Sequence, residues 1–341
     1  RDGHPVTGEI VTNAQGEAVR EPGALKGVKA IGWYIEEYGI AQVSMNITNI
    51  NDTPVHIAFD EACKSATERG MRVTGSELVG LVPLKVMLDA GKYFLEKQER
   101  SVGVSEAELV KIAVKSFGLD DLKPFDPRKK IIEYLLEDIA DAPLLQMNLK
   151  AFADETASES PAPGGGSIAA YVGALGASLA TMVANLSSHK RGWDDRWQEF
   201  SEAANQGQKL KDSLLRMVDE DTQAFNQIMA ALQLPKGSEA EQSARKQGIA
   251  DATKNAIEVP FKVMETALAS FSLIGQMAKE GNPNSVSDAG VAALCARAAI
   301  RGAFLNVKIN ASGYSDKVYA KEIVQKGEVL LIRGDETRYV N

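Results

Sequence analysis

The sequence predicts a multi-domain chain in which an α+β layered subdomain, a small sheet with helices on it, is followed by an all-α helical bundle. Three observations predict this fold class. The 341 residues suffice for about two domains, each able to bury a core. Runs with the alternation of strands are confined to the first part of the chain. From about residue 145 onward, long Ala-rich segments follow the 3.6-residue period of helices.

The first predicted element is a pair of strands within residues 28–50, joined around Gly39. Alternate residues of the second strand are apolar, which is typical of a strand with one apolar face and one polar face. Thr53 followed by Pro54 predicts the cap and first turn of a helix that ends near Gly70.

A third strand is expected in "MRVTGSEL", residues 71–78. Pro83 then introduces a helix, and Ser105 with Glu108 forms a capping box for another helix that Gly118 stops. Strands followed by helices in this order predict the α+β layer.

The second half of the chain is predicted to be helical throughout. The composition changes near residue 140, which divides the chain into residues 23–140 and residues 141–341, with residues 1–22 as a connecting segment. The expected helices cover approximately residues 167–188, 195–233, 239–281, 286–311 and 315–333.

Composition narrows the functional classes. The formal net charge of -8 argues against a general nucleic-acid or membrane-surface binder. Cys63 and Cys295 are far apart and match no metal spacing, so we expect two reduced thiols in a cytoplasmic protein. The chain begins without methionine or a secretory pattern, which favours a processed protein or a fragment, and its three scattered histidines do not predict a zinc site.

The stretch "PAPGGGSIAAYVGALGASLATMVANLSS", residues 161–188, is free of charged side chains. Its length allows a membrane span, but its Ala, Gly, Ser and Thr content favours a buried helix. A P-loop would need a lysine after the glycines. The turn at Gly164, Gly165, Gly166 and Ser167 therefore predicts either a tight structural turn or a cradle for an anionic or carbonyl group.

Asp221 interrupts an apolar stripe on the predicted helix 195–233. The stripe contains Leu214, Val218, Phe225 and Ile228, and Asp221 occupies the vacant step where a core residue belongs. The alternative is that the stripe reaches its solvent edge there. Asp219, about 200° round the helix from Asp221, is expected on a flank.

A small and polar face is predicted for the helix 286–311. Ser285, Ser287 and Asp288 are good capping residues, whereas the amides of Asn306 and Asn310 need partners if they are buried. The small residues of this helix and of 167–188 predict close-packing faces for self-association as a dimer. The face comprises Asp288, Ala292, Cys295, Ala299, Gly302, Asn306 and Asn310.

These motifs, taken together and in order, resemble the bifunctional formiminotransferase-cyclodeaminases of histidine breakdown. "APGGGS", "VDEDTQAF", "GNPNSVSD" and "NVKIN" are similar to the cyclodeaminase signatures. "IGWYIEEYGIAQVSMNITN", "TGSELVGLVP" and "KPFDPRKKIIEYLL" are similar to the C-terminal subdomain of the formiminotransferase domain. The resemblance covers essentially the whole chain.

The resemblance implies an enzyme that closes 5-formimidoyltetrahydrofolate to 5,10-methenyltetrahydrofolate with loss of ammonia. It implies Asp221 as the catalytic acid/base and Glu77 as a transferase position. The transferase subdomain with the catalytic histidine is expected to be missing, which makes residues 1–22 its connector. The residues expected to bind substrate are Gly164, Gly165, Gly166, Ser167, Asn282, Ser287, Asp288, Asn306, Asn310 and Glu77.

The chemistry itself predicts proton transfer by one carboxylate and positioning of N10 over the formimidoyl carbon, without a metal or redox cofactor. The expected partners are a folate substrate, with or without a polyglutamate tail, and further copies of the chain, but no nucleic acid and no membrane. Two other functions stay open: a non-catalytic folate-binding or oligomerisation module, and a methenyltetrahydrofolate cyclohydrolase.

Overall fold

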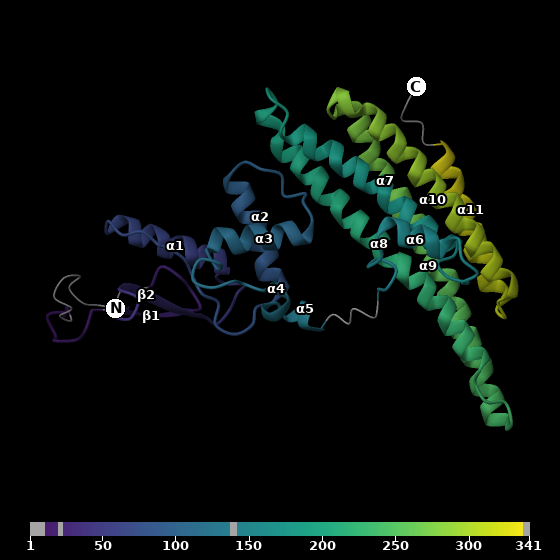
Figure 1. The fold of residues 1–341 in the computed structure, drawn as a ribbon, viewed down its shortest axis with the longest axis horizontal. Coiled ribbons are helices and arrows are strands. Elements are labelled where there is room, and N and C mark those ends of the chain that lie inside the picture. Colours follow the sequence, from purple (N-terminus) through teal and green to yellow (C-terminus); the bar gives the residue numbers. More distant parts are fainter. Residues whose placement is uncertain (1–10, 20–22, 137–141, 337–341) are drawn as a thin grey trace.

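The computed structural model describes residues 11–19, 23–136 and 142–336, and Figure 1 shows a smaller α+β part beside a bundle of long helices. The predicted fold class is therefore confirmed.

The small sheet is a two-stranded antiparallel hairpin. Strands β1 (Val28–Ile35) and β2 (Ile40–Ile47) pair with Val28 opposite Ile47, and Gly39 takes a left-handed φ of 66° in the turn, as predicted. The strand predicted at residues 71–78 is wrong. Ser76 donates from its backbone to Gly118 O (3.2 Å) and from its hydroxyl to Phe117 O (2.7 Å), so this segment is tied to a helix end instead of a sheet edge.

Five helices follow in the α+β part. The cap predicted at Thr53 is wrong, because its hydroxyl donates to Lys26 O (2.7 Å) and Pro54 takes the N-cap position. Ser105 does cap its helix, accepting from the Glu108 N–H, and Gly118 ends it with a left-handed φ of 65°. The helices are α1 (Val55–Glu68), α2 (Leu84–Lys97), α3 (Glu106–Phe117), α4 (Pro127–Lys130) and α5 (Ile132–Leu136).

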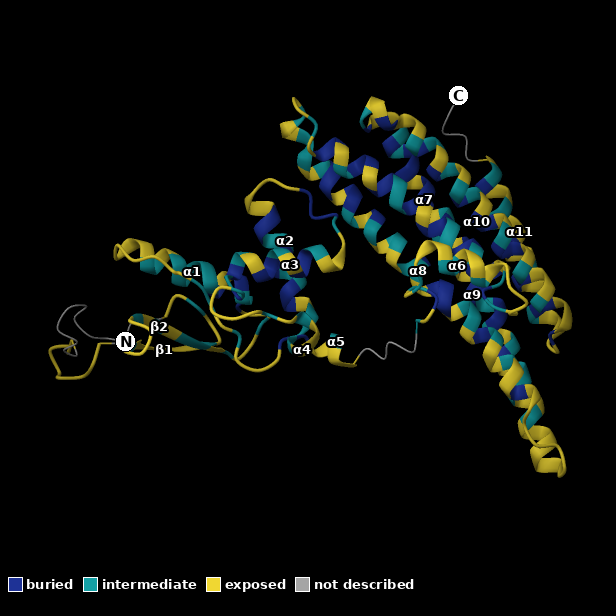
Figure 2. Cartoon of the chain, in the orientation of Figure 1, coloured by how far each residue is buried: buried dark blue, intermediate teal, exposed yellow. Residues whose placement is uncertain are grey.

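The bundle contains the five predicted long helices, each within a few residues of its expected bounds, and a short helix that was not predicted. The short helix is α6 (Leu149–Thr156). The long helices are α7 (Gly165–Ser188), α8 (Trp197–Leu232), α9 (Glu239–Glu280), α10 (Val286–Gly313) and α11 (Lys317–Glu336). Figure 2 shows buried residues along α7 to α10, whereas the α8–α9 hairpin projects from the bundle and is largely exposed at its tip.

The small-residue faces of α7 and α10 pack against each other. A Cβ added at Gly176 would lie 2.9 Å from Ala292 O and 3.0 Å from Cys295 Cβ, and one at Gly173 would lie 3.1 Å from Ala299 Cβ. Glycine is required at such a close approach. The small residues therefore pack these two helices against each other within the chain, and self-association through them stays a prediction.

Two segments, α7 and Pro283–Gly313, are long and apolar enough to cross a membrane by length and composition. Their most apolar windows are 61% and 39% buried inside the structure. Core helices of soluble proteins meet the same two criteria, so this observation by itself assigns no span.

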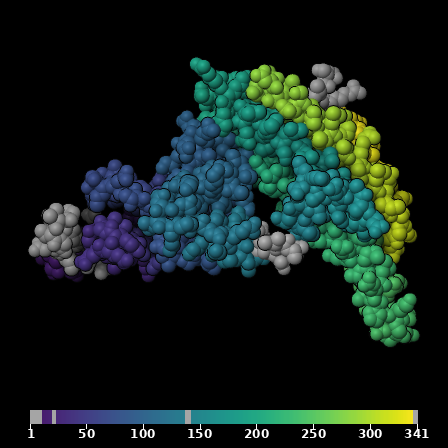
Figure 3. All heavy atoms as spheres, viewed as in Figure 1, coloured from purple at the N-terminus to yellow at the C-terminus, as the bar shows by residue number. Residues whose placement is uncertain are grey.

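A loop of the α+β part lies against the bundle. Val102 N donates to Ser201 Oγ (3.0 Å), and the side chains of Asn185 and Gln208 donate to Gly103 O at 2.8 and 3.0 Å. A Cβ at Gly103 would lie 2.1 Å from Ala204 Cβ, so the loop backbone sits directly on α8. In Figure 3 the two parts of the molecule touch along this side of the bundle.

Candidate active site

The predicted glycine turn and Asp221 come together where the N-terminus of α7 meets α8. Ser167 N donates to Asp221 Oδ2 at 2.9 Å, and Ser167 Oγ lies 3.1 Å from the same oxygen. Ser167 Oγ also lies 2.8 Å from Val218 O and 3.2 Å from Thr222 Oγ1. A buried serine thus fixes one oxygen of the carboxylate.

Glycine is required beside this carboxylate. A Cβ added at Gly166 would lie 2.1 Å from Asp221 Oδ1, closer than any side chain tolerates. At Gly164 an added Cβ would have no heavy atom nearer than Pro161 O at 3.7 Å. The glycines therefore differ: Gly166 lets the carboxylate approach the helix backbone, whereas Gly164 is the N-cap in an extended conformation.

Two opposing effects act on the ionisation of Asp221. Burial raises the pKa of this carboxyl, and the hydrogen bonds from Ser167 oppose that effect without cancelling it. No described residue donates a hydrogen bond to Oδ1, and the N–H groups of Gly165 and Gly166, in the first turn of α7, have no described acceptor. One carboxylate oxygen is therefore held while the other is free to exchange a proton.

Asn306 of α10 lies on the other side of the glycine turn. Its Nδ2 donates to Gly302 O (3.0 Å) and would be 3.3 Å from a Cβ at Gly165, while no described residue donates to its Oδ1. Asn310, one turn further along α10, donates to Ala256 O at 2.7 Å. The site brings Asn306 directly to the glycine turn, and it places Asn310 against α9.

The apolar stripe of α8 changes character at Asp221. Leu214 and Val218 are fully buried before it, whereas Phe225 and Ile228 after it are half-buried and Leu232 is 45% exposed. The cause is the start of α7 opposite Asp221, beyond which α8 lacks this neighbour. Asp221 is thus a half-buried carboxylate at the point where the apolar stripe becomes exposed to solvent. Both interpretations of the sequence, a carboxylate in a core position and a stripe that reaches its solvent edge, therefore apply in part.

Asp219 is not on an open flank, as was expected. It is only 3% exposed, and its two carboxylate oxygens accept from Leu144 N (2.9 Å) and Leu145 N (3.2 Å). The helical period placed its direction correctly relative to Asp221, but the segment that covers this side of α8 was not predicted. Asp219 therefore has a structural role in holding the 144–145 turn.

Three predicted substrate-binding residues lie at the opposite end of the bundle. Asn282 N donates to Ser187 Oγ (2.8 Å), and its side chain caps the 3₁₀ turn Pro283–Ser285. Ser287 is exposed, and no described residue donates a hydrogen bond to the half-buried Asp288. Eighteen residues of α10 separate Asp288 from Asn306, roughly 27 Å along the axis. Within this chain these residues do not join the Asp221 site.

Glu77 lies in the α+β part, in an irregular segment instead of past a strand end. Its carboxylate pairs with Lys123, and this ammonium lowers the pKa of Glu77. It is likewise not a helix-start residue, and it belongs to a region separate from Asp221.

Sequence reasoning missed Thr222, which lies next to Asp221 in "VDEDTQAF" and contacts Ser167. It also missed a set of cationic side chains, Lys236, Arg245 and Lys246, around a cavity near the α8–α9 turn. The signal for Thr222 was its place beside the catalytic candidate, whereas the cavity depends on the distant residues Tyr314 and Ser315 and has no local signature.

Comparison with protein families gives two matches. The model described as "Formiminotransferase-cyclodeaminase" matches residues 148–328, and "Formiminotransferase domain" matches residues 5–137. The chain belongs to the formiminotransferase-cyclodeaminase family. The resemblance inferred from the sequence motifs is therefore confirmed.

Several named proteins are similar to this formiminotransferase-cyclodeaminase family member. Formimidoyltransferase-cyclodeaminase of Rattus norvegicus is 38% identical over 90% of this chain and 57% of its own length. Methenyltetrahydrofolate cyclohydrolase of Methylorubrum extorquens is 38% identical over 54% of this chain and 88% of its own length. A crystal structure of formiminotetrahydrofolate cyclodeaminase from Thermotoga maritima is 28% identical and covers 57% of this chain and 96% of its own, with a TM-score of 0.49. The chain spans a little over half the length of the formimidoyltransferase-cyclodeaminases it matches.

Proposed function

We propose that the chain catalyses the cyclodeamination of 5-formimidoyltetrahydrofolate to 5,10-methenyltetrahydrofolate with release of ammonia. One observation carries the proposal: a half-buried carboxylate, Asp221, has a raised pKa and one oxygen held by Ser167 against the glycine turn. A carboxyl group whose pKa is raised by burial and whose second oxygen is free can exchange a proton with a bound ligand. The name of the Rattus norvegicus relative supports the assignment.

In the proposed mechanism, N10 of the folate attacks the amidinium-like formimidoyl carbon on N5 and forms the second C–N bond of a ring. Asp221 accepts the N10 proton and delivers it to the former imino nitrogen. The carbon–nitrogen bond to that group then breaks, ammonia leaves, and the N5–C–N10 bridge retains the positive charge. Because the attack is intramolecular, positioning N10 contributes much of the acceleration, which suits Asn306 and the free N–H groups of the glycine turn. Addition, proton transfer and elimination change no oxidation state, so the proposed reaction needs no redox cofactor.

Hydrolysis of the methenyl bridge is the second candidate, because the Methylorubrum extorquens relative carries that name at 38% identity. A non-catalytic folate-binding module is the third. A single pair of assays separates them: ammonia release from synthetic 5-formimidoyltetrahydrofolate, and decay of 5,10-methenyltetrahydrofolate above its uncatalysed rate. We expect ammonia release. Decay without ammonia release would favour the hydrolase, and neither reaction would favour the module.

We also propose that residues 23–140 are the formiminotransferase subdomain and residues 141–341 the cyclodeaminase domain of a cytoplasmic enzyme, with residues 1–22 as a connector. Two relatives named glutamate formimidoyltransferase support the first assignment, each at 35–38% identity over 22–23% of this chain. Transfer of the formimidoyl group from N-formimidoylglutamate is the corresponding activity, with Glu77 at its site, and we expect it only together with the subdomain that carries the catalytic histidine.

A homo-oligomer is part of the proposal, and the face that supports it differs from the one expected from the sequence. Leu175, Met182 and Leu186 of α7 recur at helical spacing, and each is between 37% and 47% exposed. Leu294, Leu305 and Ile309 of α10 are between 63% and 68% exposed. The helical spacing puts both sets on one side of the paired helices, and we call these six residues the apolar face. Contiguous apolar surface of this kind is typical of an interface between subunits.

A further inference from the structure

A cationic cavity lies beyond the Asp221 site, at the base of the projecting α8–α9 hairpin. Its volume is about 440 Å³, and it is bounded by the start of α9 and by the connection between α10 and α11. Cationic and neutral polar side chains line it, among them Lys236, Arg245, Lys246, Gln242 and Ser315. Nothing in the proposed cyclodeamination chemistry requires these side chains.

The charges around this cavity are not neutralised by the described residues. The side chains of Lys236 and Lys246 make no hydrogen bond or ion pair there, and Arg245 donates only to Leu232 O, at 3.1 and 3.4 Å. Two carboxylates close by in the chain accept hydrogen bonds from backbone N–H groups. Glu241 accepts from Gly237 and Ser238, and Asp316 accepts from Val318 and Tyr319. The cavity is therefore suited to an anion with more than one negative group.

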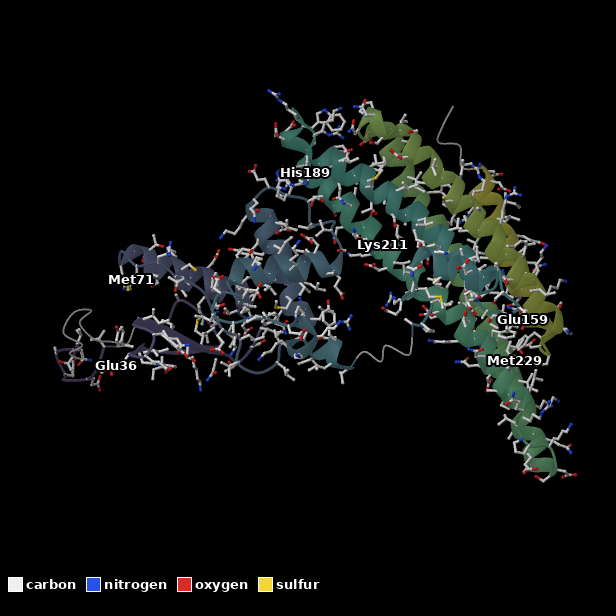
Figure 4. The ribbon with its side chains drawn as sticks, viewed as in Figure 1. Glu36, Met71, Glu159, His189, Lys211 and Met229 are labelled. Carbon is white, nitrogen blue, oxygen red and sulfur yellow. The ribbon has the colours of Figure 1, made fainter. Side chains whose placement is uncertain are left out.

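The positions of residues along α8 and α10 give the distance between the cavity and the Asp221 site along the bundle axis. Leu232, whose carbonyl Arg245 contacts, is eleven residues after Asp221 on α8, and Gly313 is seven residues after Asn306 on α10. At 1.5 Å per residue, the cavity lies about 10–16 Å along the bundle axis from the site. Figure 4 shows the side chains of this hairpin, with Met229 labelled on it.

We propose that this cavity binds the two carboxylates at the glutamate end of the folate substrate. The inference rests on the proposed function, because that substrate carries a benzoylglutamate arm on N10. A benzene ring and one extended amino-acid residue span roughly three residue lengths, about 10 Å, which reaches the nearer end of the cavity as measured along the axis.

Binding of p-aminobenzoylglutamate to the whole chain tests the proposal without any turnover. We expect calorimetry to detect this probe and to give at least ten-fold weaker binding for p-aminobenzoate, which lacks the glutamate. Lys236→Gln with Lys246→Gln should weaken binding of the glutamate probe about ten-fold, since charged hydrogen bonds are lost. Lys321→Gln on α11 removes the same charge from an exposed position outside the cavity and should leave binding unchanged.

Kinetics provide the second measurement. The double variant should raise the KM for 5-formimidoyltetrahydrofolate with kcat retained, because the interaction is equal in the ground and transition states. Equal binding of both probes, or unchanged probe binding in the double variant, overturns the cavity assignment. Absence of ammonia release from the unmodified chain would instead overturn the proposed function, so the two failures are distinguishable.

Discussion

At the scale of single residues, Asp221 and Asp219 show how two carboxylates of one helix come to differ. Asp219 has both oxygens hydrogen-bonded by backbone N–H groups, whereas Asp221 has one oxygen held and one free. Only the free oxygen of Asp221 can exchange a proton with a ligand. The carboxylate suited to catalysis is therefore the less buried of the two.

Replacement of Asp221 by Asn should separate activity from folding. The amide oxygen can still accept from Ser167, but the group can no longer take the N10 proton, so ammonia release should fall about 100-fold or more. Glu220→Gln, an exposed neighbour on the same helix, should retain activity. Circular dichroism should report unchanged helicity for both variants. A folded Asp221→Asn variant with near-normal ammonia release would contradict the assignment.

The raised pKa of Asp221 predicts the pH dependence of both activity and stability. Ammonia release needs the ionised carboxylate, so its acidic limb should lie above the pH expected for an ordinary aspartate of pKa about 3.9. The effect of pH on stability has the opposite sign to its effect on activity, because a raised pKa means that folding favours the protonated carboxyl group. This contribution is present below the ordinary pKa and is lost as pH rises through the raised value. Asp221→Asn should therefore melt at the same or a slightly higher temperature at pH 7, as calorimetry would measure, and a lower melting temperature would contradict this account.

At the scale of elements, the glycines at the start of α7 differ in how closely they lie to Asp221. Gly166→Ala inserts a Cβ where Oδ1 lies and should displace the carboxylate, lowering ammonia release at least ten-fold. Gly164→Ala has free space and should retain most of the activity. Equal activities of the two variants in the same assay would show that the close approach at Gly166 does not matter for catalysis.

The same elements show what the sequence could and could not predict. The five long helices were predicted because their period and end signals are local, as with Ser105 and Gly118. The strand at 71–78 was wrong because Ser76 bonds to Gly118, 42 residues away in the chain, and local β propensity cannot reveal that partner.

The candidate site was predicted only in part, because local patterns do not reveal contacts between residues that are distant in the sequence. Helical period correctly put Asp288, Asn306 and Asn310 on one helix, but a shared face extends over the whole length of α10 and does not specify distance. The contact of Asp221 with Ser167 depends on how α7 meets α8. The position of Asp219 against Leu144 likewise depends on a segment 75 residues earlier.

At the scale of the whole molecule, Gly103 links the α+β part to the bundle. A Cβ would lie 2.1 Å from Ala204 Cβ, so Gly103→Ala should push the 101–103 loop away and break the bonds that Asn185 and Gln208 donate to Gly103 O. Limited proteolysis should then cut the loop faster, with the helices of the bundle intact. Gly80→Ala, with open space but φ +85, is a control for local strain away from this contact, and an unchanged cutting rate in Gly103→Ala would contradict the docking role.

The apolar face leads to the final prediction, that a second copy of the chain covers it. Six large apolar side chains on two adjoining helices exceed the scattered exposure of a monomer surface, and a stable interface needs about 800 Å² per partner. Sedimentation velocity should give a dimer or a higher oligomer at micromolar concentration. Leu294→Glu would bury a charge at the interface and should yield monomers of unchanged helicity, whereas Val318→Glu on α11, 70% exposed but outside the face, should not. A monomeric unmodified chain, or equal effects of the two substitutions, would show that this face is not the contact between subunits.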